Sequence, residues 1–175
     1  MSASIIVVDD EPGPRESLRM ILKNDHTVRL AGSGPEALEL IQQDKPDLVF
    51  LDIRMPEMDG TEVLRQIKQT APEVEVAMIT AYAGVPSAQR AMRLGAMDYL
   101  TKPFGVSEVE AVVDRVLTRM QEQNEEELLL QQLGETITQL SQALAQVRGP
   151  NAASDDNAVL QGLTSAHSSI ENQLN

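Results

Sequence analysis

The chain of 175 residues contains no cysteine, which excludes both a disulfide framework and a zinc site built on thiolates. It also has no long apolar run. The first such run, Ile5 to Val8, lacks a basic flank and stops at Asp9, so it is neither a signal peptide nor a membrane span. We therefore expect a soluble, cytoplasmic protein.

Basic residues are scarce, because 14 Lys and Arg stand against 27 Asp and Glu and give a formal net charge of −13. No cluster of Lys and Arg is present to bind a phosphate backbone, which disfavours direct contact with nucleic acid. A Gly-rich ATP-binding loop is missing as well. With 42% apolar residues, the chain suffices for one ordinary domain and an appendage.

Residues 1 to about 120 alternate short apolar strands with amphipathic helices. The pattern predicts five strands, at residues 4–8, 27–31, 48–52, 74–80 and 97–101. It predicts helices at 14–23, from 34, at 60–70, at 88–94 and from an N-cap at Ser107 to about Met120. This alternation indicates an α/β fold, a doubly wound five-stranded parallel sheet with helices on both faces.

The central strand, residues 48–52, is apolar throughout and ends on a carboxylate, Asp52. Because chemistry collects at the carboxyl ends of strands in open α/β sheets, Asp52 is the candidate nucleophile. Asp9 and Asp10 end the first strand, and adjacent parallel strands would bring the three carboxylates together. Their repulsion would raise at least one pKa unless a hard cation neutralises them, and Mg²⁺ suits such oxygen ligands.

Two further strand ends carry functional groups, the hydroxyl of Thr80 and the ammonium of Lys102. A carboxylate nucleophile, an acidic metal site, a hydroxyl and an ammonium together suit the acceptance of a phosphoryl group. Each has an ordinary alternative: an Asp-Asp pair after a strand is commonly a solvated turn, and Lys102 alone would be a surface lysine. The coincidence of four such strand ends favours a site.

Four segments, in this order, resemble the receiver domains of two-component response regulators. They lie at residues 7–11, 47–60, 78–82 and 95–104 and read VVDDE, DLVFLDIRMPEMDG, MITAY and GAMDYLTKPF. The resemblance covers residues 4 to about 120 and is closest to receivers of enhancer-binding regulators. It implies the flavodoxin-like strand order 2-1-3-4-5. The helix-turn-helix, ATPase motor or cyclase that usually follows such a receiver is not recognisable in the chain.

The resemblance implies that Asp52 accepts a phosphoryl group from the histidine of a sensor kinase or phosphotransfer protein. Thr80 and Lys102 would contact the phosphoryl oxygens, and Thr80 would act with Tyr99 as the switch. Mg²⁺ would be held by three carboxylates and one main-chain carbonyl, those of Asp9, Asp10, Asp52 and Arg54. The chain would then be no dedicated enzyme, beyond phosphotransfer and autodephosphorylation at Asp52, and it would signal through contacts with another protein.

Residues 121–148 predict a helical coiled coil. Apolar residues repeat there at spacings of three and four, at Leu130, Leu133, Ile137, Leu140, Leu144 and Val147. Three valines, Val109, Val112 and Val116, share this register, but Arg119, Gln123 and Glu126 interrupt it and Gly134 weakens the helix. We expect the tail to form a homodimer, with packing onto the receiver or docking on another protein as the alternatives. Residues 149–157 form a predicted linker, and 158–175 a short amphipathic helix or a disordered tail.

Two other functions are weighed against this interpretation. In the first, the chain is the receiver fragment of a transcription regulator whose DNA-binding part is absent. In the second, His167, on one face with Leu163 and Ile170, is the histidine of a phosphorelay or kinase component. The pattern around His167 is poor and favours an ordinary tail residue. His26 has no evident partner in the sequence and is given no role.

Overall fold

The computed structural model describes residues 2–81 and 85–147. The chain divides into two units, with the boundary between Thr118 and Arg119. The predictions for Tyr82, for the linker at 149–157, for the segment at 158–175 and for His167 lie outside the described residues. Within the described residues, no helix combines the length and the apolar character needed to cross a bilayer.

The first unit is built on a five-stranded sheet in which every neighbouring pair is parallel. Its strands are β1 (Ser4–Val8), β2 (Thr27–Ala31), β3 (Leu48–Asp52), β4 (Glu75–Thr80) and β5 (Asp98–Thr101). The order is β2-β1-β3-β4-β5, which confirms the predicted fold class and strand order. The order reverses between β1 and β3, so the carboxyl ends of these two strands flank the position where ligands bind in such sheets.

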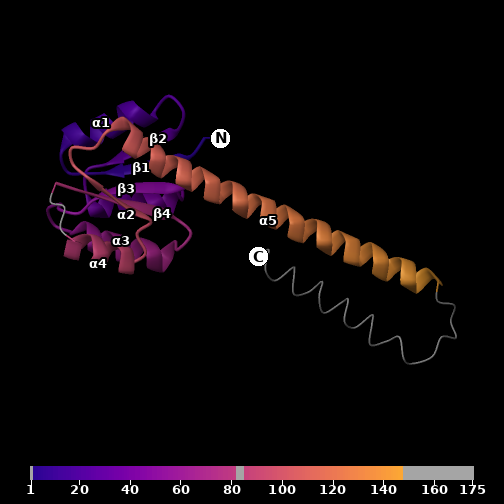
Figure 1. The fold of residues 1–175 in the computed structure, drawn as a ribbon. Coiled ribbons are helices and arrows are strands. Elements are labelled where there is room, and N and C mark those ends of the chain that lie inside the picture. Colours follow the sequence, from indigo (N-terminus) through magenta and orange to yellow (C-terminus); the bar gives the residue numbers. More distant parts are fainter. Residues whose placement is uncertain (1, 82–84, 148–175) are drawn as a thin grey trace. The chain divides into compact units, whose positions relative to one another are not determined.

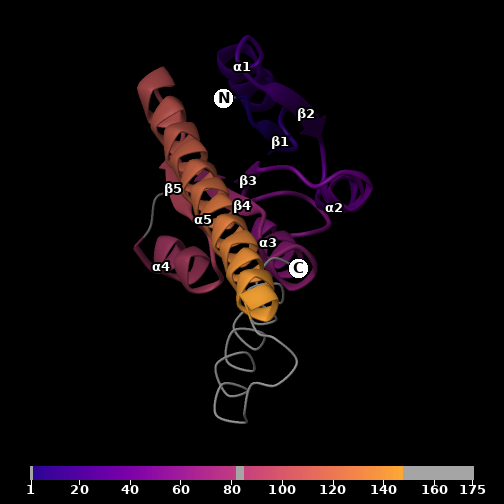
Figure 2. The same ribbon diagram turned by 90° about the vertical axis from the view of Figure 1, so that its right-hand side faces the viewer.

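Five helices accompany the strands: α1 (Pro12–Leu22), α2 (Gly34–Gln43), α3 (Gly60–Thr70), α4 (Val85–Arg93) and α5 (Val106–Val147). Figure 1 shows α1 and the first turns of α5 on one side of the sheet, and α2, α3 and α4 on the other. The view turned by 90° agrees that α2 and α3 lie side by side (Figure 2). The sheet is therefore covered on both faces, as predicted.

Several predicted boundaries are wrong. The first helix begins at Pro12 rather than Pro14, because proline is compatible with the first helical turn. The fourth helix begins at Val85, and the fifth strand at Asp98. Ser107 lies inside α5 and is not its N-cap; the side chain of Glu108 accepts from the main-chain N of Gly105 instead, at 2.6 Å.

The helix expected to end near Met120 continues to Val147. The residues after Met120 are mostly Glu, Gln and Leu, which are strong helix formers, and one glycine costs such a helix only about 1 kcal/mol. The valines at 109, 112 and 116, although in register with the later leucines, are buried within the first unit. They therefore belong to the core of the first unit, and only the later apolar residues of α5 form an exposed stripe.

The core is concentrated on the two central strands. Every residue of β3 is buried, as are the last four of β1, which is typical of parallel strands covered on both faces. A cluster that includes Val63, Leu64 and Ile67 of α3 packs between one face and its helices. At the other end of the strands, Nδ1 of His26 accepts from the main-chain N of Ala3 at 3.2 Å, a partner that sequence reasoning missed.

Gly60 is expected to tolerate no side chain. A Cβ there would lie 2.0 Å from the carbonyl O of Asp52, because Gly60 N donates to the carbonyl of Ile53 at 2.8 Å and draws α3 against the end of β3. Gly60→Ala should lower the free energy of unfolding in urea by about 2–3 kcal/mol. Gly13→Ala is the control, since nothing lies within 4 Å of that position. Its stability should stay unchanged or rise, and equal losses in both variants would contradict the prediction.

Candidate functional site

Three charged side chains meet at the carboxyl edge of the sheet. Asp9 follows β1, Asp52 ends β3 and Lys102 follows β5. The Nζ atom of Lys102 lies 2.7 Å from Oδ2 of Asp9 and 2.7 Å from Oδ1 of Asp52. The strand pairing brings these ends together, since Val8 pairs with Leu51 and Thr80 with Thr101. One ammonium therefore bridges two carboxylates at the switch point of the sheet.

Asp52 is buried, with 4% of its surface exposed. Its Oδ2 accepts from the main-chain N of Arg54 at 2.7 Å, and its Oδ1 carries the contact to Lys102. Burial raises the pKa of the Asp52 carboxyl, the ion pair with Lys102 lowers it, and Asp9 raises it again; the net direction is upward. The pKa of Asp52 is thus raised, but the largest cause is burial rather than repulsion between carboxylates.

Lys102 is held in place by main chain as well as by charge. Its N donates to the carbonyl O of Thr80 at 2.7 Å, and only 14% of its side chain is exposed. Burial, the largest single influence, lowers the pKa of the ammonium, but Asp52 and Asp9 together outweigh it and the net direction is upward. Lys102 therefore stays charged and directed at Asp52.

Thr80 and Tyr99 occupy the last two strands. Thr80 ends β4 and is 3% exposed, beside the end of β3 because Asp52 pairs with Ile79. Tyr99, half-buried in β5, packs against the hydrophobic cluster. The carboxylate of Asp98 accepts from the main-chain N of Tyr99 at 2.7 Å and pairs with Arg115 of α5. This link between β5 and α5 was not predicted.

The predicted metal ligands are only partly assembled. Asp9 and Asp52 share Lys102, but in residues 2–81 and 85–147 no three Asp, Glu or His side chains form a group that could hold a metal ion, so Asp10 does not complete one. Oδ2 of Asp9 is buried and contacts the Lys102 ammonium at 2.7 Å, which leaves part of its acceptor capacity unused. Buried carboxylate oxygens with unused acceptor capacity fit a hard divalent cation.

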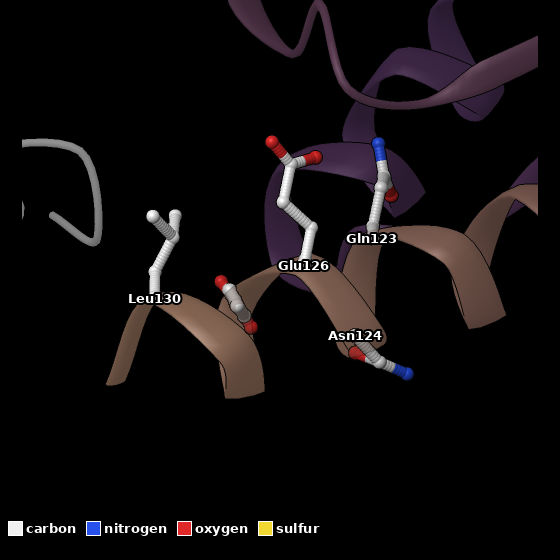
Figure 3. A pocket seen from close by; sticks show the side chains of 5 residues that line it. Gln123, Asn124, Glu126 and Leu130 are labelled. Carbon is white, nitrogen blue, oxygen red and sulfur yellow. The ribbon is translucent and has the colours of Figure 1, made fainter. Parts of the chain in front are cut away.

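The second unit offers a different surface. A hollow of about 560 Å³ runs along α5 and is lined by Gln123, Asn124, Glu126, Glu127 and Leu130. Figure 3 shows Gln123, Glu126 and Leu130 on one side of the helix and Asn124 on the other. Gln123, Glu126 and Leu130 follow the spacing of the predicted seam, and the residues at these positions change from polar to apolar at Leu130. The lining residues that the structure describes include no cation to bind phosphoryl oxygens.

The sequence of the first unit matches a known protein family. The family model of the response regulator receiver domain matches residues 5–114. Response regulator MprA of Mycobacterium ulcerans is 42% identical over 127 residues, which are 72% of this chain and 55% of that protein. The chain thus spans about half the length of the curated relatives it matches.

Solved structures give the same result. The receiver domain of NtrX from Brucella abortus is 38% identical, with a TM-score of 0.63, over 65% of this chain and 98% of that one. The longer NtrX of the same organism, solved in complex with ADP, is 35% identical with a TM-score of 0.68, over 81% of this chain and 34% of that one. The chain belongs to the receiver domain family of two-component response regulators.

Proposed function

We propose that Asp52 is the residue on which this receiver accepts its phosphoryl group from the phosphohistidine of a sensor kinase or phosphotransfer protein. The observation that carries the proposal is the single ammonium of Lys102 between two buried carboxylates at the switch point. A carboxylate oxygen of Asp52 forms a bond to phosphorus as the P–N bond of phosphohistidine breaks. The imidazole nitrogen keeps the electron pair, and the product is an acyl phosphate.

Lys102 and Thr80 are assigned to bind the negatively charged oxygens of the phosphoryl group. The ammonium already lies 2.7 Å from Asp52 Oδ1, so it is within reach of a phosphoryl oxygen on that side chain. The Thr80 hydroxyl, at the next strand end, donates to another. Charge-assisted hydrogen bonds of this kind are the stronger ones, and in a buried site they stabilise charge that develops during transfer.

Receiver domains generally bind Mg²⁺ for phosphorylation. In this chain we assign the ion to the carboxylates of Asp9, Asp10 and Asp52 and the main-chain carbonyl of Arg54. The buried carboxylates of Asp9 and Asp52, which share a single ammonium and so keep a net negative charge, support this set. When bound, Mg²⁺ neutralises negative charge on the transferring phosphoryl oxygens. Lys102 then shares the carboxylates with the ion and can turn toward the phosphoryl group.

The switch is assigned to Thr80 and Tyr99. Phosphorylation adds up to about two negative charges beside Thr80 and can bias a two-state arrangement of the last strand and helix. Tyr99 neighbours Asp98, whose ion pair with Arg115 joins β5 to α5. Thr80 pairs with Thr101 of β5, so a change at Thr80 acts on the strand that Asp98 and Arg115 join to α5, the helix that continues into the tail.

Incubation with Mg²⁺ and acetyl phosphate tests the function. The intact chain should gain the mass of one phosphate, and the adduct should be removed by alkali and by hydroxylamine, as an acyl phosphate is. An adduct stable to both reagents would identify an ester on a hydroxyl instead and contradict the assignment to a carboxylate.

The output is assigned to pairing of α5 with a second copy of the chain. Three residues of the predicted seam, Leu133, Leu140 and Leu144, follow one another at intervals of seven and four residues, and they share a face of the helix with Leu129, which was not in that seam. Each is 43–59% exposed. Glu135 is the one charged residue from Leu128 to Val147, so little repulsion opposes pairing there. Burying a leucine contributes about 1.5–3 kcal/mol, which makes several such positions enough to hold two helices together.

Leu133→Asp combined with Leu140→Asp should convert a dimer into a monomer in sedimentation experiments on the full chain. The two aspartates would place like charges inside the pairing surface. Leu128→Asp is the control, because Leu128 is 56% exposed but lies off this face. The acidic residues from Glu122 to Glu127 oppose pairing, so added salt should strengthen the wild-type dimer. A wild-type chain that is monomeric at tens of micromolar would leave the tail as a docking segment for another protein.

A further inference from the structure

Arg15 lies behind the acidic turn that follows β1. Its Nη1 donates to the main-chain carbonyl O of Asp9 at 2.5 Å, from the second turn of α1. The residue is half-buried. Within the described part of the chain its guanidinium makes no ion pair, since the salt bridges of α1 involve Arg19 instead. A half-buried cation directed at a main-chain carbonyl, rather than at a carboxylate, needs an explanation.

The same guanidinium lies against the turn between β2 and α2. A Cβ on Gly32 would lie 3.3 Å from Nη1 of Arg15 and 3.6 Å from Oε2 of Glu36, so glycine leaves room for the arginine. Glu36 fixes this turn by accepting from Gly32 N at 2.7 Å. The N of Asp9 donates to the carbonyl of Ala31 at 3.2 Å. The main chain of Asp9 is therefore held by Ala31 at its N–H and by Arg15 at its carbonyl.

These contacts determine where the Asp9 carboxylate points. Its Oδ1 accepts from the main-chain N of Glu11 at 2.9 Å, and its buried Oδ2 contacts Nζ of Lys102 at 2.7 Å. Rotation of the peptide between Asp9 and Asp10 would move that oxygen and the Asp10 side chain together. The one side chain that bonds to the carbonyl of this peptide is Arg15, within the residues described.

We propose that Arg15 is a positioning residue for the Mg²⁺ site, which orients the Asp9 and Asp10 carboxylates by holding the carbonyl between them. The inference rests on the proposed function. The inference predicts that loss of the Arg15 side chain weakens Mg²⁺ binding, whereas loss of its charge alone would strengthen it. A nearby cation repels Mg²⁺, so loss of a mere charge at Arg15 would tighten metal binding. Loss of a positioning contact weakens it, and removal of such outer partners of metal ligands commonly costs about tenfold or more in affinity.

Calorimetric titration of the full chain with Mg²⁺ distinguishes the two effects. Arg15→Met keeps the length of the side chain but removes its charge and donors, and its Mg²⁺ dissociation constant should rise about tenfold. Arg15→Lys can donate to the same carbonyl and should recover most of the affinity. Arg19→Met is the matched control, because Arg19 lies on the same helix and pairs with Glu16; it should bind Mg²⁺ as the wild type does.

Unchanged or tighter Mg²⁺ binding by Arg15→Met would overturn the inference, as would an equal loss in Arg19→Met. Should Arg15→Met fail to fold, Arg15→Gln replaces it, because its shorter, neutral side chain lacks the charge and the reach of the guanidinium; unchanged affinity there would also overturn the inference. A wild-type chain that binds no Mg²⁺ would instead reject the proposed metal site itself, so the two failures are distinguishable.

Discussion

Asp52→Asn is expected to take up no phosphate from acetyl phosphate and Mg²⁺, whereas the wild-type chain takes up one. Asparagine has nearly the same shape but lacks the anionic oxygen that must attack phosphorus, so the loss should be complete rather than partial. Intact mass measures it directly. Asp44→Asn is the control, because that carboxylate has 75% of its side chain exposed and lies at the end of α2. It should be labelled like the wild type, and undiminished labelling of Asp52→Asn would reject the assignment.

The same substitution should flatten the dependence of stability on pH. The folded-state pKa of Asp52 lies above its ordinary value, chiefly through burial. A carboxyl with a raised pKa contributes stability that is present below its unfolded pKa of about 4 and is lost as the pH rises through the folded value. Asparagine does not titrate. Urea unfolding at several pH values without Mg²⁺ should therefore show a smaller loss toward neutral pH in Asp52→Asn than in the wild type.

The sheet could be predicted because each strand is a short apolar run bounded by turn residues, and parallel pairing then follows from the alternation with helices. The contact between Lys102 and Asp9 could not be predicted from the strand pattern alone, since these residues lie far apart in the sequence. It depended on the strand order, which came from the resemblance. The sequence placed the Lys102 ammonium at the same edge as the three carboxylates, but it did not predict direct contact with two of them. In the structure Lys102 pairs with both Asp9 and Asp52, and among the described residues Asp10 does not complete a metal-binding group with them.

Two features of the structure could not be predicted from the sequence, for physical reasons. A spacing of three and four residues marks any buried helix face, so Val109, Val112 and Val116 could not be separated from the leucines that follow them in the same register. In the structure those valines are 0–1% exposed, whereas Leu133 and Leu140 are about half exposed. The bond from Arg15 to the carbonyl of Asp9 depends on the path of the main chain between β1 and α1, which residue types alone do not specify.

Lys102→Ala is expected to lose about 3 kcal/mol of unfolding free energy near pH 8 without Mg²⁺, because Asp9 and Asp52 would remain buried without their counter-charge. The deficit should shrink toward pH 5. Without the ammonium the pKa of Asp52 would rise further, and protonation would then remove a buried charge. Added Mg²⁺ should also reduce the deficit, since a cation bound only by the folded chain stabilises it. Urea unfolding across pH measures both effects.

Lys45→Ala is the matched control for charge. Lys45 pairs with Glu73 at 2.5 Å, but more than half of each side chain is exposed, and such pairs contribute at most about 1 kcal/mol. Its stability should change little and its labelling by acetyl phosphate not at all. Lys102→Ala should be labelled at least about tenfold more slowly, because the charge that would stabilise the phosphoryl oxygens is gone. A Lys102→Ala chain that matches Lys45→Ala in stability near pH 8 and in labelling rate would mean that the ammonium between Asp9 and Asp52 serves neither the fold nor the transfer.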